Sequence, residues 1–424
     1  MTNTLLFAIY LVLSFTKSFV LKRSETILVA LLALLNFTHI LDFMIMMPLG
    51  NILMPKWELT TSQFAVIVSS YSLAAFVSSF AAIFFADKFD RKKLLLMAYF
   101  GFLLGTFGCV FATGHYTMVL ARVITGVFGG LIGAQVLSII GDVIPYERRG
   151  QAMGLLMGGF ALASVVGVPF GLFLANNFDW YFPFIVVAVV GSFLYPFLLR
   201  YIPNVDAHLA NPIDLNQRVQ NFFLIFSNKT QVTALVFSML MIMGHFIIIP
   251  LINPYMVYNV GVKQEYTPLI YLCGGLSAMI TAQITGKIAD RYGKRQVFVA
   301  SALVSTIFIF FITNMPTMPL FIVLLTFALW FSTATGRTVP GQAMTTQAVN
   351  AETRGSFMSL NSCVQSLGSG LATLASGWIT YSDSNYAIHN YNILGYISII
   401  VILLSVAMAY RLDRLIMLHF TVKA

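Results

Sequence analysis

Two ionisable side chains, His39 and Asp42, lie three positions apart inside a long apolar run, in the stretch THILDFMIMMPLG (residues 38–50). On a helix, this spacing places them on neighbouring faces of one turn. A charge at the centre of a bilayer costs about 2.5–3.5 kcal/mol on insertion scales, so a carboxylate there needs a partner, a wet cavity or a proton. Because burial favours the neutral form of a carboxyl group, we expect Asp42 to act as a proton carrier.

Other roles stay open for both side chains. Asp42 could cap a backbone kink near Pro48, tie its helix to a neighbouring helix, or contact a ligand directly. His39 could pack and form a hydrogen bond, or it could relay the proton of Asp42. If the two groups interact strongly, they titrate as a pair.

Two arginines, Arg122 and Arg337, also fall inside apolar runs. At a rise of 1.5 Å per residue, the depths of Arg122 and Asp42 differ by roughly 8 Å, which an extended arginine and one water could bridge. The alternative for Arg122 is a side chain that reaches the outer membrane surface. Arg337 has no acidic neighbour in its own run, so it either contacts an anionic or polar substrate or binds backbone carbonyls at a helix end.

The elements that must position these residues are membrane-spanning helices. The 424 residues are 58% hydrophobic and only 9% charged, whereas soluble domains carry about 25% charged residues. Twelve apolar runs approach or exceed the length of about 20 residues that a spanning helix needs. They fall at roughly 27–53, 62–85, 94–113, 117–140, 151–175, 181–200, 231–256, 267–288, 297–313, 318–345, 356–380 and 391–410.

The basic residues give the orientation. Only Lys56 and Lys263 of the 24 lysines and arginines face outward when the N-terminus is placed inside, and twenty lie in inner loops or tails. This is the positive-inside pattern, so we expect both termini to be cytoplasmic. The net charge of +9 is thus a topology signal and does not indicate nucleic-acid binding. Residues 5–15 are apolar but too short to span, and we expect residues 1–25 to lie on the inner face or to be disordered.

The chain contains an internal repeat. The loops FFADKFDRKKLLL and GKIADRYGKRQV place Asp87 and Asp290 203 positions apart, and the loops PYERRGQAM and NAETRGSFM place Arg149 and Arg354 205 apart. Two landmarks with nearly one period indicate two six-span halves. The predicted division is an N-terminal segment (1–25), an N-terminal half (26–200), a cytoplasmic linker (201–230), a C-terminal half (231–410) and a cytoplasmic tail (411–424).

The repeat brings a second histidine into consideration. Aligning Pro48 with Pro250 places His245, in GHFIIIP, one position from the equivalent of Asp42. His245 is therefore predicted to face the same central region from span 7. A histidine that is only a satisfied core residue is the alternative.

These features resemble the major facilitator superfamily over residues 27 to 410. The second-half loop fits the superfamily pattern G-x-L-A-D-R-x-G-R-K, and the first-half copy is similar but has Ile83 and Asp90 in place of the glycines. LARVITGVFGG resembles the span-4 motif with Arg122, and GVPFG resembles the span-5 motif of proton-coupled exporters, with its Gly-Pro pair split by Val168. The resemblance implies an all-α membrane protein with twelve transmembrane helices in two pseudo-symmetric halves that rock around a central site.

The resemblance also implies roles for particular residues. In such exporters the span-4 arginine influences protonation of the span-1 carboxylate, so Asp42, His39, Arg122 and His245 are the candidates for proton coupling. The candidates that line the substrate cavity are Asn36, Met46, Gln135, Asn253, Trp330, Arg337, Asn361 and Gln365. The candidates for the cytoplasmic gate are Asp87, Arg91, Lys92, Gly286, Asp290, Arg291, Gly293, Lys294 and Arg295, with Asp87 and Asp290 expected to begin the next helices.

The span-5 residues Gly167, Pro169 and Gly171 form a candidate packing device, because glycines four apart allow close helix approach and proline permits a bend.

Taken together, the sequence predicts a transporter that exports a small molecule, such as a drug, sugar or metabolite, in exchange for protons. An importer or uncoupled facilitator of the same fold is the alternative, and a non-transporting membrane sensor is a third hypothesis. We expect no enzyme activity, no metal, no cofactor, and no partner besides substrate, protons and lipid. A monomer in a bacterial inner membrane is expected.

Overall fold

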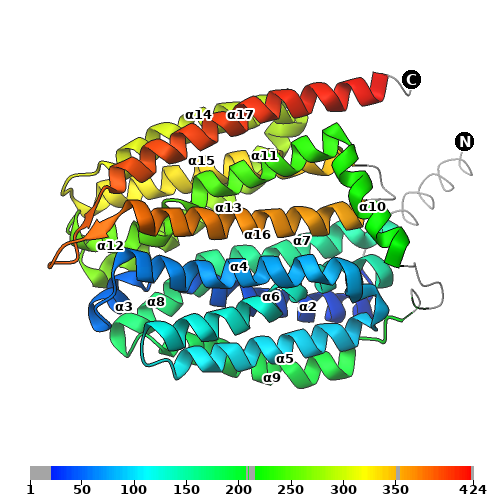
Figure 1. The fold of residues 1–424 in the computed structure, drawn as a ribbon, viewed down its shortest axis with the longest axis horizontal. Helices are drawn as coiled ribbons and strands as arrows, with labels where there is room; N and C mark the ends of the chain where they lie inside the picture. The colour runs from blue at the N-terminus through cyan, green and yellow to red at the C-terminus, as the bar shows by residue number, and fades with distance from the viewer. Residues whose placement is uncertain (1–20, 207–208, 210–214, 350–353, 422–424) are drawn as a thin grey trace, which may run out of the picture.

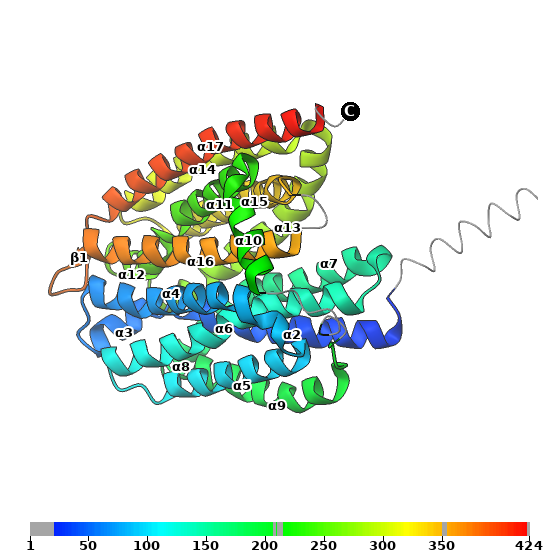
Figure 2. The same ribbon diagram turned by 45° about the vertical axis from the view of Figure 1, so that its right-hand side comes forward.

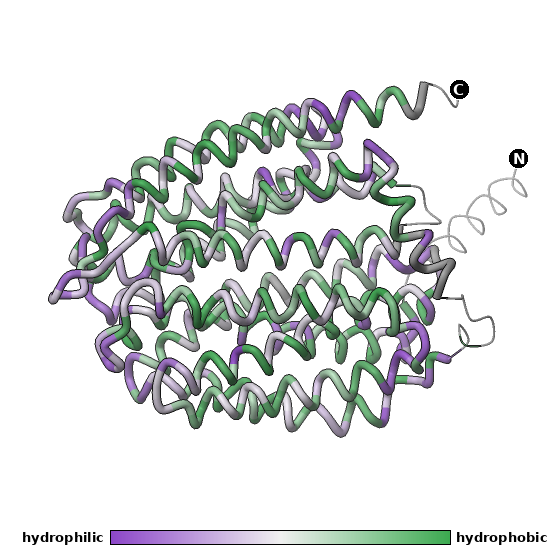
Figure 3. Tube along the Cα trace, viewed as in Figure 1, coloured by the Kyte–Doolittle hydropathy of each residue, from purple (hydrophilic) through white to green (hydrophobic). Residues whose placement is uncertain are grey.

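The computed structural model describes residues 21–206, 209, 215–349 and 354–421. Long helices lie side by side and run between two ends of the molecule (Figure 1). Hydrophilic residues gather toward the two ends and hydrophobic ones fill the length between them (Figure 3). The end that carries α3 and α12 is called the outer end, following the orientation predicted from the basic residues, and the opposite end is called the inner end.

The first half consists of six spans, two of them broken. Span 1 is α2 (Arg23–Ile45) with α3 (Gly50–Lys56), and span 5 is α7 (Tyr146–Leu162), the π-helix η2 (Ala163–Gly167) and α8 (Val168–Asn177). The other spans are α4 (Thr61–Phe85), followed by the short η1 (Ala86–Lys88), then α5 (Arg91–Val110), α6 (His115–Val143) and α9 (Phe182–Tyr201).

The second half repeats this order after a linker that contains the helix α10 (Leu215–Ser227). Span 7 is again broken, into α11 (Lys229–Phe246), η4 (Ile249–Leu251) and α12 (Ile252–Tyr258). The remaining elements are η5 (Gln264–Tyr266), α13 (Thr267–Tyr292), α14 (Lys294–Thr313), α15 (Leu320–Gln347), α16 (Arg354–Ile379), a hairpin of β1 (Tyr381–Ser382) and β2 (Ile388–His389), and α17 (Tyr391–Thr421).

Eleven helical stretches in the described residues are long and apolar enough to cross a membrane. The twelfth span is α16, which has 26 residues but carries many serine, threonine, asparagine and glutamine side chains. It packs along α4 of the other half in both views (Figures 1 and 2), so its polar side chains are shielded from lipid on that side. The twelve-helix, two-half fold is confirmed.

The breaks in spans 1 and 7 follow directly from prolines. Pro48 lies between α2 and α3, and Pro250 lies in η4 between α11 and α12. A proline has no N–H to donate to the preceding turn and its ring clashes with that turn, so the regular helix ends there. The breaks are 202 positions apart, so the repeat extends to backbone geometry.

The start of α5 corrects one prediction. Asp87 lies in η1, and Asp290 lies in the last turn of α13, so neither begins a helix. The N-cap of α5 is Asp90, whose carboxylate accepts hydrogen bonds from the backbone N–H of Lys92 (2.7 Å) and Lys93 (3.3 Å). At the equivalent position before α14 stands Gly293, with φ of +97°, a conformation that side chains rarely adopt. The equivalent helices α5 and α14 thus begin differently, one with a capping aspartate and the other with a glycine in a left-handed conformation.

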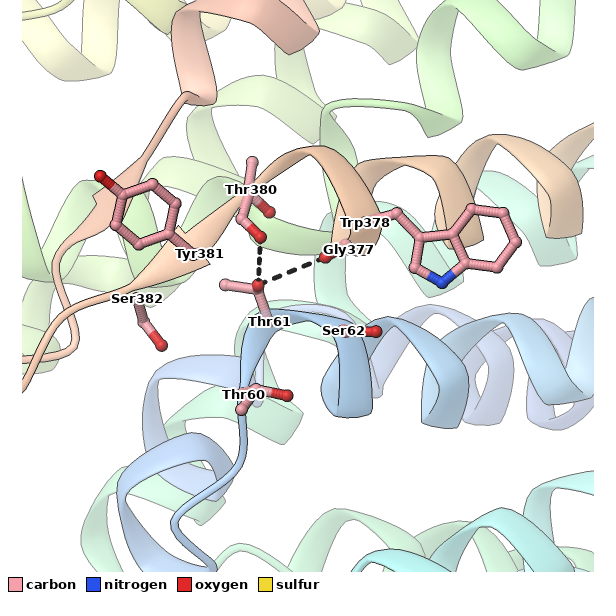
Figure 4. A pocket seen from close by; sticks show the side chains of 8 residues that line it. All are labelled: Thr60, Thr61, Ser62, Gly377, Trp378, Thr380, Tyr381 and Ser382. Carbon is pink, nitrogen blue, oxygen red and sulfur yellow. Dashed lines mark hydrogen bonds between the residues drawn. The ribbon is translucent and has the colours of Figure 1, made fainter.

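The halves are joined at the outer end. The side chain of Asn253 donates hydrogen bonds to the Pro48 carbonyl (2.5 Å) and to Asn51 Oδ1 (2.8 Å), and Tyr258 donates to the Asn51 carbonyl (2.6 Å). At the outer end of α4, the Thr61 hydroxyl contacts the carbonyls of Gly377 (3.4 Å) and Thr380 (2.7 Å), beside a shallow pocket (Figure 4). The structure is therefore a state closed at the outer end.

Some predicted features fall outside the described residues. These are the apolar segment at residues 5–15, Asp214 of the linker, and residues 350–353 of the loop before α16. In the described part of the linker, α10 packs on the inner end of α4, where the Phe222 ring lies 5.7 Å from the rings of Phe80 and Phe84.

Candidate functional site

Asp42 forms a direct ion pair with Arg122 in the interior of the first half. Arg122 Nη1 donates to Asp42 Oδ2 at 2.6 Å and to the backbone carbonyl of Asp42 at 3.3 Å. Both side chains are fully buried, with no accessible surface. The water predicted between them is not needed, and Arg122 does not extend to the outer surface.

A third residue holds the other oxygen of the carboxylate. The hydroxyl of Thr106 on α5 donates to Asp42 Oδ1 at 3.2 Å. It reaches this position because α5 and α6 pack closely, and a Cβ at Gly105 would lie 2.7 Å from the backbone nitrogen of Thr125. The carboxylate is therefore bound on both oxygens, by one charged and one neutral donor.

His39 lies beside this pair and contacts a different partner. Its Nε2 is 2.6 Å from the hydroxyl of Tyr71 on α4, while the guanidinium of Arg122 stacks over the Tyr71 ring at 4.6 Å from its centroid. A Cβ at Gly129 would lie 3.0 Å from His39 Nε2, so α6 leaves room for this contact only because it carries a glycine there. His39 thus has a hydrogen-bond partner in Tyr71, and its role, as a packing residue or as a relay, stays a prediction.

The second half holds a similar cluster. Arg337 Nη2 on α15 lies 3.3 Å from His245 Nδ1 on α11, and since an arginine can only donate, the imidazole nitrogen accepts. The His245 ring also packs on the indole of Trp330, with centroids 5.1 Å apart. Arg337 and Trp330 are each 1% exposed, whereas His245 is half-buried.

Aromatic rings connect the two clusters across the interface between the halves. Phe43, the residue after Asp42, packs against Tyr71 (5.0 Å between centroids) and against Phe246 of the second half (5.9 Å). Phe246 in turn packs against its neighbour His245. Phe43, Phe246 and His245 are half-buried. The contact of Phe43 with Phe246 joins the two halves and places His245, the neighbour of Phe246, next to their interface.

The other predicted cavity residues divide into three groups. Gln135 and Asn361 are buried, and their side-chain oxygens find no hydrogen-bond donor among the described residues. Gln365 donates to Ser238 within its own half (3.3 Å), and Asn253 is part of the outer contact. Asn36 and Met46 are buried on span 1, on either side of Asp42 along the chain.

The predicted gate residues form ion pairs within their own halves. Arg91 binds Asp142 through Nε at 2.8 Å, and its Nη2 lies 4.0 Å from Asp87 Oδ1. Arg295 binds Asp413 at 2.9 Å. The guanidinium of Arg291 packs over the Tyr292 ring. Lys92 and Lys294 lie in the first turns of α5 and α14, Gly286 lies in α13, and Asp290 is exposed. These pairs stabilise each half without joining the two.

The span-5 motif packs directly behind the Asp42 helix. A Cβ at Gly167 would lie 3.0 Å from the Leu41 side chain, and one at Gly171 would lie 2.6 Å from that of Ile45. Pro169 stands at the start of α8, just after the π-helix, whose backbone contacts α13 of the other half at Gly275. The predicted close approach of the helices is confirmed, and it places span 5 against both span 1 and the second half.

Sequence reasoning missed three residues of these sites. Thr106 and Tyr71 are a lone threonine and a lone tyrosine on neighbouring helices, and no spacing marks them. Asn51 had a signal, because it stands 202 positions before Asn253, the same period that relates Pro48 to Pro250. Within the described ranges, no group of three histidine, cysteine or acidic residues is placed to hold a metal ion.

A family model for the Major Facilitator Superfamily matches residues 32–244 and again residues 234–415. Among curated proteins, the chain is similar to the uncharacterized MFS-type transporter YceJ of Bacillus subtilis, with 26% identity over 349 residues, 81% of this chain and 87% of the relative. It is also 24% identical over 276 residues to a probable sugar efflux transporter of Pasteurella multocida. That alignment covers 64% of this chain and 66% of the relative.

Solved structures show the same fold at lower identity. A bacterial homologue of the human lysosomal transporter Spinster, in an inward-facing and unoccupied conformation, gives a TM-score of 0.73 at 14% identity, over 94% of this chain and 98% of that one. A D-xylose–proton symporter gives 0.71 at 16% identity, over 90% of this chain and 96% of that one. At these identities the likeness concerns the arrangement of the helices.

Proposed function

Because the chain belongs to the Major Facilitator Superfamily and is a multi-pass membrane transporter, we propose that it exports a small molecule in exchange for protons. Family membership does not by itself give the coupling to protons or the direction of transport, and both are part of the proposal. It rests on one observation above all, the fully buried ion pair of Asp42 and Arg122 at the centre of the first half.

The geometry of the pair suits a carboxylate that changes its protonation state. An ion pair removed from water is costly, and it is stable only when the geometry is good and the remaining polar atoms are satisfied. Here Thr106 and Arg122 satisfy the carboxylate in the state closed at the outer end. Protonation of Asp42 would break the charge–charge contact, while Arg122 would keep its bond to the Asp42 carbonyl and its stacking on Tyr71.

Antiport then follows if protonation and substrate favour opposite conformations. The pair joins α2 to α6 within the first half, and we propose that its loss on protonation changes how this half packs against the second half. The membrane potential supplies about 2.3 kcal/mol per charge per 100 mV, which corresponds to roughly a fifty-fold substrate gradient per proton at 1.4 kcal/mol per tenfold.

Two further observations support export. One is the span-5 motif, which lies against both Asp42's helix and the second half. The other is the similarity to relatives named as sugar efflux transporters, at 21–24% identity. We propose the cytoplasmic membrane of a bacterium as the location, with both termini inside and the chain acting as a monomer.

The test uses the purified full chain. A thermal-shift screen across sugars, lipophilic drugs and organic acids, at two pH values, first identifies a substrate. Addition of that substrate in unbuffered solution is expected to release about one proton per protein molecule, and Asp42→Asn is expected to release none while still binding. Asp179→Asn is the matched control, because Asp179 pairs with Lys56 at the exposed outer surface.

Transport in everted membrane vesicles then gives the direction. Proton-coupled export is supported if an acidic vesicle lumen drives substrate accumulation in that lumen and if Asp42→Asn abolishes the accumulation. Full pH-dependent transport by Asp42→Asn would contradict proton exchange through Asp42. Proton and substrate movement in the same direction would support an importer, and substrate movement without protons would support a facilitator.

A further inference from the structure

We propose that Arg337, His245 and Trp330 form a binding subsite for the carboxylate of an organic acid with a flat apolar body. The inference rests on the proposed transport function, since it names the class of substrate that the transporter would carry. It is carried by a buried positive charge in the second half that has no negative partner in the described part of the chain.

Arg337 is 1% exposed and makes one polar contact, through Nη2 to His245. Its Nε and Nη1 find no hydrogen-bond acceptor among the described residues, although both are buried. A guanidinium stays charged in proteins and carries five N–H donors in a planar fork. A buried charge without a counter-ion is destabilising, so we expect this fork to bind a partner that the described part of the chain does not provide.

The Trp330 indole and the His245 imidazole add N–H donors to the cluster. Trp330 Nε1 is buried and unpartnered among the described residues. Since His245 Nδ1 accepts from Arg337, the proton of the neutral imidazole sits on Nε2, which can therefore donate. Guanidinium, indole and imidazole thus offer only N–H groups. A carboxylate, which only accepts, is their chemical complement.

The charge of the cluster selects one class of anion. One guanidinium balances a single negative charge, so a monoanionic carboxylate is compensated while a phosphate dianion would keep an excess charge. A carboxylate also matches the guanidinium fork with two parallel N–H···O bonds. The subsite is therefore specific for acids over the amides of the same shape.

The surroundings indicate the rest of the ligand. The Trp330 indole packs on His245, and Phe246 packs on Phe43 of the other half. His245, Phe246 and Phe43 are half-buried, and the contact of Phe43 with Phe246 joins the two halves. Aromatic faces of this kind stack on planar apolar groups, so the body attached to the carboxylate is expected to be flat and apolar.

The experiment measures binding of matched acid and amide pairs to the purified full chain. The probes are benzoate with benzamide and indole-3-acetate with indole-3-acetamide, and the readouts are the melting temperature and isothermal titration calorimetry. We expect each acid to bind at least tenfold more tightly than its amide. Arg337→Gln is expected to remove this preference, and Arg337→Lys to keep part of it, because lysine retains the charge and loses the fork.

Asp179→Asn is the control, because Asp179 pairs with Lys56 at the exposed outer surface, and it is expected to keep the acid preference. Equal binding of acid and amide by the wild-type chain, binding of no acid in the series, or an unchanged preference in Arg337→Gln would each overturn the subsite. A cooperative melting transition and unchanged amide binding in Arg337→Gln exclude misfolding as the cause of its lost preference. Because binding is measured without a gradient, an acid preference without proton release would leave the subsite in place and contradict the proton exchange instead.

Discussion

Each half of the molecule buries an arginine on its fourth span, and the two halves balance its charge differently. In each half the arginine lies on the fourth span and contacts a side chain of the first span, Arg122 with Asp42 and Arg337 with His245. Both arginines are buried. The partner, however, is a carboxylate in the first half and an imidazole in the second.

This one difference changes the electrostatics of the two clusters. The first cluster is neutral overall and closed, because Thr106 and Arg122 occupy both oxygens of the carboxylate. The second cluster carries a net positive charge, because Arg337 contacts a histidine and has no acidic partner among the described residues, whereas each arginine keeps two nitrogens without an acceptor there. The two arginines are 215 positions apart, so they do not occupy equivalent positions of the repeat, which relates Pro48 to Pro250 over 202 positions. We infer that the first half is suited to a proton and the second half to an anion.

The largest expected effect is the loss of stability when the closed cluster loses its cation. Arg122→Met leaves the Asp42 carboxylate buried without its counter-ion, and breaking a buried pair in this way costs about 3–5 kcal/mol. The measurement is the apparent free energy of unfolding in mixed micelles. Asp42→Asn combined with Arg122→Met is expected to recover part of the loss, since no charge then remains.

Arg337→Met is the matched change in the second half. It removes a charge that has no anionic partner, so stability is expected to stay unchanged or to rise by up to about 2 kcal/mol. Opposite signs of the change in unfolding free energy in Arg122→Met and Arg337→Met would support the difference in charge balance between the two halves. Equal losses in both would show that Arg337 is balanced by a group on the protein after all.

A second prediction converts one cluster into the other. In His245→Asp the carboxylate oxygen Oδ1 stands the same number of bonds from Cα as the histidine Nδ1 that accepts from Arg337. The variant therefore supplies Arg337 with an internal anion. Its preference for acids over amides is expected to fall at least tenfold, which corresponds to about 1.4 kcal/mol.

His245→Asn is the control for this change, because it keeps an acceptor at the same position without the charge. It is expected to retain most of the acid preference measured by calorimetry. If asparagine and aspartate weaken acid binding equally, then the shape of the imidazole matters and its lack of negative charge does not.

The sequence was sufficient for the framework that carries the two clusters. Apolar runs predicted the twelve spans, and the loop repeat predicted two halves. The breaks in spans 1 and 7 were not predicted beyond a kink considered near Pro48, although the missing N–H of Pro48 and Pro250 acts locally. Such features depend on neighbours along the chain and need no knowledge of the fold.

The contacts between helices were less accessible. Depth counted along separate helices gave the roughly 8 Å between Arg122 and Asp42, but it could not show that the side chains meet directly at 2.6 Å. Thr106 closes the carboxylate only because Gly105 lets α5 approach α6. The wrong start predicted at Asp87 has a local cause, since Asp90 three residues later caps α5 instead.

The smallest expected effect comes from the neutral hydrogen bond beside the closed cluster. Tyr71→Phe removes the hydroxyl that lies 2.6 Å from His39 Nε2 and keeps the ring on which Arg122 stacks. The loss in stability is expected to be about 0.5–1.5 kcal/mol, the usual net value of one such bond. Tyr99→Phe is the matched control, because the Tyr99 hydroxyl forms a hydrogen bond with Thr38 at 3.0 Å in the same half without touching a histidine.

Both variants are expected to lose similar stability, so stability alone does not identify a relay. Substrate-induced proton release does: if His39 passes the proton of Asp42, the rate of release slows in Tyr71→Phe and stays unchanged in Tyr99→Phe. Equal rates in the two variants would leave His39 as a packing residue and Asp42 as the titrating group of the first half.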